Sequence, residues 1–268
     1  MCTVTWLRER GGYTLLCNRD ESLSRKPALA PAVKEHRGIR FIAPEDGDHG
    51  GAWIAVNQFS VALCLLNRCQ DNRYQDSGAN GANHTSRGQL LLDLVDSSSG
   101  AEVLRSVCAV DLVRFQPFTL LALEPDRDAL VIEWTGSTCS IRHEGQSAVM
   151  LSSSSYKTAS VIEARRTCFD GLTGGRSRLD AATLFRLHAS HSPVRGAFSP
   201  CMHREDAQTV SFSLIKATGE AVEFSYHPDS PCTADPANLA FSEIKRTQSQ
   251  LAGASTLAYQ SRASRLEP

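Results

Sequence analysis

The sequence lacks the long apolar segments that mark membrane and exported proteins. No stretch approaches the roughly 18 consecutive apolar residues that a membrane-spanning helix requires. The N-terminus has no apolar core of about 7 to 15 residues, the length found in signal peptides. We therefore expect a protein without stable membrane insertion that is located in the cytoplasm.

Charge of either sign is not concentrated in any segment. The 28 Lys and Arg residues nearly balance the 29 Asp and Glu residues, which leaves a formal net charge of -1. No run of like charges is long enough to follow a phosphate backbone or an anionic membrane surface. We expect no nucleic-acid partner.

Several motifs of enzymes and metal proteins are also missing. The chain has no G-x-S-x-G nucleophile elbow and no C-x-x-C pair, and its 9 cysteines cannot all form disulfides within one chain. The odd cysteine count favours a reducing compartment. His188 and His191, with Cys201 and His203, offer zinc or haem ligands, but no second ligand pair with matching spacing accompanies them. We therefore predict no metal and no cofactor.

The hydrophobic pattern predicts an α+β chain. Period-two alternation or short apolar runs predict strands at residues 2–7, 13–18, 39–43, 52–56, 60–66, 118–123, 129–134, 139–142, 148–152, 208–216 and 220–226. Helical spacing predicts a helix capped by Ser86 and others at residues 101–110, 158–171 and 180–190. Two packed, mainly antiparallel sheets with helices outside would bury these patterns. We expect a single domain over residues 1–244 and a loosely ordered tail over residues 245–268.

The first two strands place a cysteine beside an arginine. A loop at residues 9–12 would pair Cys2 with Arg19 on one face of the sheet, while Asn18 and Asp20 face the other way. The guanidinium is expected to lower the pKa of the Cys2 thiol. If Met1 is removed, the α-amine of Cys2 supplies a base with a pKa of about 7.7 to 8.0. The spacing alone also fits an ordinary strand residue near a terminus.

Three stretches carry a family resemblance: the MCT start, CNRDE at residues 17–21 and FSYHPDSPC at residues 224–232. Together they resemble the NRDE family of transport and Golgi organisation protein 2-like proteins over roughly residues 1–232. That family is similar to N-terminal-nucleophile hydrolases of the bile-salt hydrolase and penicillin V acylase type. The resemblance implies a four-layer αββα sandwich and a cysteine nucleophile exposed by methionine removal.

The resemblance also implies roles for particular residues. Cys2 would be nucleophile and base, with Arg19 and Asp20 beside it, and Asp20 would hold the amine or an arginine. Asn67, in ALCLLNR, resembles the asparagine that donates to the oxyanion. Arg204, in CMHREDAQTVS, resembles a late arginine of the hydrolase site, and we expect it to be buried near Cys2 and able to bind a substrate carboxylate.

Two further positions are expected at this site. Ser153, in MLSSSS, stands where many relatives have an asparagine, so a hydroxyl would serve there as a second oxyanion or positioning group. Trp53, in a glycine-tryptophan stretch, is expected to line a pocket for an apolar acyl group.

Two functions are compatible with these residues. The first is an N-terminal-nucleophile cysteine hydrolase that cleaves a non-peptide C–N amide or a thioester through an acyl-enzyme, with a small-molecule acyl amide or thioester as substrate. The second is a non-catalytic carrier or trafficking protein that binds acyl-CoA, lipid or haem in the same pocket. A homo-oligomer is compatible with either function.

Overall fold

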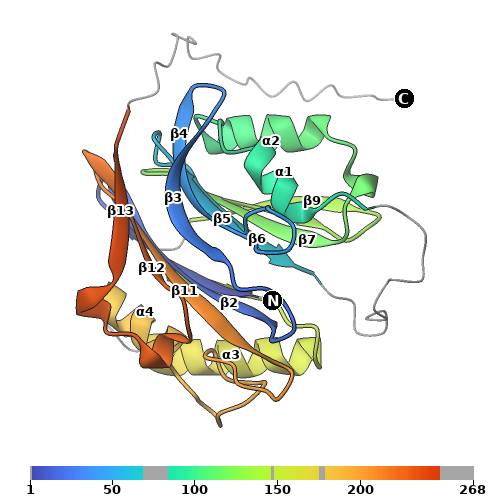
Figure 1. The fold of residues 1–268 in the computed structure, drawn as a ribbon, viewed down its shortest axis with the longest axis vertical. Coiled ribbons are helices and arrows are strands. Elements are labelled where there is room, and N and C mark those ends of the chain that lie inside the picture. Colours follow the sequence, from blue (N-terminus) through green and yellow to red (C-terminus); the bar gives the residue numbers. More distant parts are fainter. Residues whose placement is uncertain (1, 69–83, 146–147, 175–178, 248–268) are drawn as a thin grey trace, which may run out of the picture.

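The computed structural model describes residues 2–68, 84–145, 148–174 and 179–247 (Figure 1). Their strands form two antiparallel sheets. The six-stranded sheet runs in the order β10 (Ala148–Ser152), β1 (Cys2–Glu9), β2 (Gly12–Ser22), β11 (Ala207–Ala217), β12 (Ala221–His227) and β13 (Ala240–Lys245). The seven-stranded sheet runs in the order β3 (Leu29–His36), β4 (Ile39–Glu45), β5 (Ile54–Asn57), β6 (Ala62–Asn67), β7 (Phe118–Leu123), β8 (Ala129–Trp134) and β9 (Cys139–Glu144).

Helices cover the outer faces of both sheets, which gives four layers (Figure 1). Helices α1 (Arg87–Asp93) and α2 (Gly100–Ala109) pack on the seven-stranded sheet. Helices α3 (Thr158–Thr173) and α4 (Ala181–His188) pack on the six-stranded sheet. Short 3-10 turns lie at Leu112–Arg114 (η1), Pro231–Thr233 (η2) and Pro236–Asn238 (η3). The predicted αββα sandwich is confirmed.

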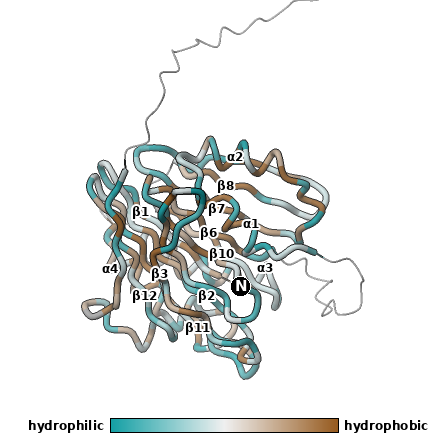
Figure 2. The backbone as a smooth tube through the Cα atoms, turned by 45° about the horizontal axis from the view of Figure 1, so that its top comes forward, coloured by the Kyte–Doolittle hydropathy of each residue, from teal (hydrophilic) through white to brown (hydrophobic). Residues whose placement is uncertain are grey.

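The core is divided into three apolar clusters by the two sheets. The largest lies between the sheets and contains Cys2, Trp6 and Cys17 from the first hairpin with Trp53 and Cys64 from the opposite sheet. The other two lie between each sheet and its helices. Figure 2 shows that β6, β7 and β8 are largely hydrophobic in colour, whereas many connections are hydrophilic. Buried charged side chains on the strands of either sheet, such as Arg19 and Asp20, therefore mark candidate sites.

The first hairpin has the predicted register. Cys2 pairs with Arg19 and Arg8 with Tyr13, and the ladder continues by one more pair to Glu9 and Gly12. The loop is thus shorter than expected, because Gly11 adopts a φ of 75°, which suits a tight turn. Residues Cys2, Val4 and Cys17 face the opposite sheet, as predicted.

Two strands were not predicted, β3 and β13. Both are edge strands, and exposed apolar side chains such as Leu29, Val33 and Phe241 interrupt the alternation expected of a half-buried strand. Strand β13 ends at Lys245, where the loosely ordered tail was expected to begin. Residues 248–268 of that tail, and Met1, lie outside the described residues, so expectations about them stay predictions.

No helix among the described residues is long and apolar enough to cross a membrane.

Candidate active site

A cavity of about 340 Å³ opens at one end of the two sheets, and Cys2 lines it. Strands β1 and β2 bring Cys2 and Arg19 into it side by side, and β6 brings Asn67 from the opposite sheet. Trp53 and Leu65 add apolar surface, so the expectation that Trp53 lines a pocket is confirmed. The cavity thus combines a thiol, a carboxamide and a guanidinium.

Ser153 lies next to the backbone nitrogen of Cys2. Strand β10 pairs with β1, with Ser152 opposite Thr3, and the chain then continues past the start of β1. The Cys2 N–H donates to Ser153 Oγ over 3.0 Å, and the Ser153 N–H donates to the Cys2 carbonyl over 2.9 Å. The Ser153 hydroxyl thus contacts the Cys2 nitrogen, and its role as a second oxyanion or positioning group stays a prediction.

Asn67 ends β6 at the cavity wall. Its side chain is half-buried, and among the described residues its carboxamide has no hydrogen-bond partner. Carboxamide N–H groups are strong donors, so this group is free to bind a ligand oxygen.

The Arg19 guanidinium contacts an aromatic ring and two carboxylates. Its guanidinium lies 4.2 Å from the centre of the Trp53 ring, and Nη2 is 2.5 Å from Asp46 Oδ2 and 3.5 Å from Glu21 Oε2. A cation paired in this way stabilises a neighbouring thiolate much less than a free one would.

The Cys2 thiol is buried and neutral. A hydrogen bond with Cys17, together with burial, raises the pKa of Cys2 well above its usual value. Cys17 Sγ is in turn 3.8 Å from Cys64 Sγ, so three thiols follow one another into the core. The expectation that Arg19 lowers the pKa of Cys2 is therefore wrong, because apolar burial and the neighbouring thiol favour the protonated form.

Asp20 and Asn18 face the helical layer, as the strand alternation predicts. Asp20 Oδ2 lies 3.0 Å from Arg165 Nη1, and Thr209 Oγ1 donates to Asp20 Oδ1 over 2.7 Å. Asp20 thus holds an arginine, as expected, but the arginine is Arg165 of α3. Asn18 donates to the carbonyl of His188 over 2.9 Å.

Arg165 was missed by the sequence analysis. It is completely buried, and its Nη1 also donates to Thr3 Oγ1 over 2.8 Å. One signal could have found it: Arg165 lies four residues after Val161 and four before Phe169, on the apolar face of its helix. A charge in that position needs a buried partner.

Arg204 is placed differently from the expectation. Its side chain is 23% exposed rather than buried, it pairs with Asp206 over 2.7 Å, and it lies over the ring of Tyr156. It is not among the described residues that line the cavity of Cys2. A role for Arg204 in the site stays a prediction.

Charged side chains cluster where Arg19, Arg25 and Asp46 line the cavity. Asp46 accepts from Arg25 over 2.7 Å and from the N–H groups of Asp48 and His49. Burial would raise the pKa of Asp46, but Arg25, the His49 N–H and Arg19 outweigh it and lower the pKa. Asp46 therefore stays ionised and fixes Arg19 at the mouth.

Comparison with solved structures shows the same fold in three hydrolases. A variant of conjugated bile acid hydrolase from Clostridium perfringens has 11% identity and a TM-score of 0.53, with 92% of this chain and 98% of that chain covered. An N-acylethanolamine-hydrolyzing acid amidase orthologue from Caenorhabditis elegans has 11% identity and a TM-score of 0.52, with 88% and 95% covered. Penicillin V acylase from Agrobacterium tumefaciens has 11% identity and a TM-score of 0.50, with 91% and 86% covered.

Sequence comparison identifies the family. No curated protein matches the chain. The sequence profile described as Transport and Golgi organisation 2 matches residues 1–199, which include both strands of the Cys2 hairpin and the Asn67 strand. The chain has an N-terminal-nucleophile hydrolase-like fold and belongs to the Transport and Golgi organisation 2 family.

Proposed function

We propose that this protein is an N-terminal-nucleophile cysteine hydrolase that cleaves a non-peptide C–N amide or a thioester in a small molecule. The observation that carries the proposal is the position of Cys2, which lines a cavity and whose backbone N–H donates to Ser153 Oγ. The fold shared with three amide or bile acid hydrolases supports it.

The first step follows from removal of Met1, which turns the Cys2 nitrogen into a free α-amine. The amine takes the thiol proton as Sγ attacks the substrate carbonyl carbon, so one residue supplies nucleophile and base. Because the pKa of the Cys2 thiol is raised, the proton stays on sulfur in the free protein and has to move to the amine during the attack. Ser153 Oγ holds an N–H of the amine and leaves its lone pair free for the proton.

The remaining steps complete a balanced cycle. The carbonyl oxygen becomes an oxyanion that accepts from the Asn67 carboxamide, a contact worth about 3 to 4 kcal/mol in related sites. The leaving amine or thiol takes the proton from the Cys2 ammonium and departs, which leaves an acyl-enzyme. Water then attacks the acyl carbon, its proton passes to the amine, and the free acid is released with the thiol restored.

The volume and the lining of the cavity limit the size and the chemistry of the substrate. Ligand pockets usually enclose about 300 to 1,000 Å³, and about 340 Å³ lies at the small end of that range. Trp53 and Leu65 suit a short apolar acyl group, and the charged mouth at Arg25 and Asp46 suits a polar leaving group.

A non-catalytic carrier of acyl-CoA, lipid or haem is the second candidate. The observation that favours it is the buried, protonated thiol of Cys2, which is a weak nucleophile unless the α-amine is free. Retention of Met1 would block that amine.

The two candidates separate in a turnover assay with small N-acyl amides and acyl thioesters. We expect Cys2→Ala to abolish turnover and Asn67→Ala to reduce it by about 100- to 1,000-fold, since only one oxyanion donor is lost. Cys2→Ala should lower the free energy of unfolding by no more than about 1.5 kcal/mol, as for one buried methyl group.

The matched control is Cys108→Ala, which removes an exposed thiol from α2 and should leave turnover unchanged. Equal hydrolysis by wild type and Cys2→Ala would contradict the mechanism. Undiminished ligand binding without turnover in any variant would establish the carrier.

A further inference from the structure

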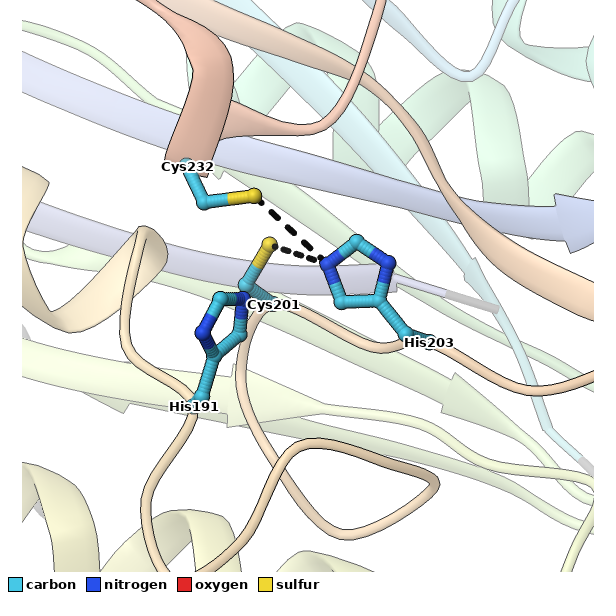
Figure 3. A group of neighbouring side chains, drawn as sticks. All are labelled: His191, Cys201, His203 and Cys232. Carbon is cyan, nitrogen blue, oxygen red and sulfur yellow. Dashed lines mark hydrogen bonds between the residues drawn. The ribbon is translucent and has the colours of Figure 1, made fainter.

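Four side chains with metal-binding atoms converge outside the cavity of Cys2 (Figure 3). His191 follows α4, Cys201 and His203 lie in the loop before β11, and Cys232 lies in η2. Each offers one nitrogen or sulfur, and these atoms all lie within 4.8 Å of one another. Three separate segments thus contribute two thiols and two imidazoles.

The distances match a tetrahedral zinc site. In a tetrahedral site the zinc–sulfur bond is about 2.3 Å and the zinc–nitrogen bond about 2.0 to 2.1 Å, so a sulfur and a nitrogen bound to the same ion lie about 3.6 Å apart. His203 Nε2 lies 3.4 Å from Cys201 Sγ and 3.6 Å from Cys232 Sγ. The His191 and His203 rings are 5.1 Å apart between centroids, at an interplanar angle of 69°, which places two imidazoles beside both sulfurs.

We propose that His191, Cys201, His203 and Cys232 bind one Zn²⁺ ion. Two thiolates with two neutral imidazoles are a ligand set typical of structural zinc sites, and four protein ligands leave no open position for a substrate. Binding releases the two thiol protons to solvent while the imidazoles coordinate as neutral ligands. The ion is therefore a structural element rather than a catalytic one.

The expectation of no metal at these residues rested on the absence of a matched second pair. Cys232 supplies the missing ligand from 29 residues beyond His203. Its position depends on the turn after β12, which spacing along the chain does not reveal.

The site would tie the loop before β11 to η2. Met202, next to two of the ligands, donates its N–H to Thr209 Oγ1 over 2.8 Å, and Ser230 Oγ donates to the Thr209 carbonyl over 2.6 Å. Thr209 Oγ1 in turn donates to Asp20. The ion would therefore stabilise the two segments that hold Thr209 against Asp20.

Arg195 offers an independent control. Its Nη2 is 3.2 Å from His203 Nδ1, and its side chain is exposed. Coordination through Nε2 leaves the proton on Nδ1, so two donors would then face each other and the arginine would turn to solvent. Arg195→Gln should bind zinc at least as tightly as wild type.

The test measures zinc in the full chain purified under reducing conditions without chelator, and cobalt absorption after exchange. We expect one zinc ion per chain and the intense visible bands of tetrahedral cobalt with thiolate ligands. Cys232→Ser, which alters a surface residue and spares the buried Cys201, should weaken zinc binding by at least roughly 100-fold, beyond the loss typical of an outer-shell change. Added zinc should raise the Tm of wild type but not that of Cys232→Ser.

Cys108→Ser, an exposed cysteine outside the cluster, should keep full zinc content. The proposal is overturned if wild type titrated with zinc binds none, or if Cys232→Ser binds it as tightly as wild type. A Cys201–Cys232 disulfide that persists in the native protein purified under reducing conditions would also overturn the proposal, as would haem bound at these four residues in place of zinc.

Discussion

Replacing Arg165 by methionine should strongly destabilise the fold, because it leaves a carboxylate buried without its cation. Asp20 and Arg165 are both completely buried, and their charged atoms lie 3.0 Å apart. Met fills much of the same volume, so the main loss is electrostatic rather than a cavity. The two hydroxyls of Thr3 and Ser152 lose a donor as well.

The expected loss in the free energy of unfolding is about 3 to 5 kcal/mol, the usual cost of removing one partner of a buried ion pair. For a chain of this size that corresponds to a fall in Tm of about 6 to 20 °C. Combining the change with Asp20→Asn should cost less than the sum of the two single variants, since the second change removes the stranded charge.

Urea denaturation of the two single variants and the double variant measures both quantities. Arg166→Met is the matched control, because Arg166 is the next residue of α3, is exposed, and among the described residues donates to the Met150 carbonyl alone. A loss below about 1 kcal/mol for Arg165→Met, or strict additivity in the double variant, would refute the reasoning.

Two further predictions concern a buried histidine and a close backbone contact. Burial, with Arg165 nearby, lowers the pKa of His188 to about 3, so His188 should still be neutral at pH 5 by NMR of its ring nitrogens. The unfolded chain binds a proton at His188 below about pH 6.5, whereas the folded chain does not, so the free energy of unfolding falls by about 1.4 kcal/mol for each unit that the pH is lowered from about 6.5 to 3. A titration midpoint of His188 near pH 6.5 in the folded protein would contradict this. A Cβ on Gly12 would lie 2.1 Å from the Ala217 carbonyl oxygen, so Gly12→Ala should cost about 1 to 3 kcal/mol or more in urea denaturation. Gly219→Ala, which meets open space, should be nearly neutral, and equal losses would reject the contact.

Strands that are buried on at least one face could be predicted from the sequence, often to the residue. Strands β7 and β8 have the predicted bounds, because their apolar residues face two packed layers. Strand β3 could not be predicted in the same way, since its exposed Leu29 and Val33 carry no alternation. Its backbone pairs with β4, and such pairing is not a local property of the sequence.

The candidate site likewise combines local features that the sequence predicts with long-range contacts that it does not. The pairing of Cys2 with Arg19 follows from one short loop, so it is local and predictable. The partners of Arg19 are not local, because Asp46 and Trp53 come from the connection between β4 and β5 and determine what its charge can do. Arg165 reaches Asp20 from a helix more than a hundred residues away, and Cys232 reaches His203 through a turn after β12.

The proposed catalysis is tested most directly by the intact mass of the native protein, taken alone and after rapid quenching during reaction with an acyl thioester. The account predicts a chain without Met1 that gains one acyl group, located on Cys2 by peptide mapping and absent from Cys2→Ala. Hydrolysis by a chain that retains Met1, or acyl groups only on exposed cysteines such as Cys108 and Cys139, would contradict it.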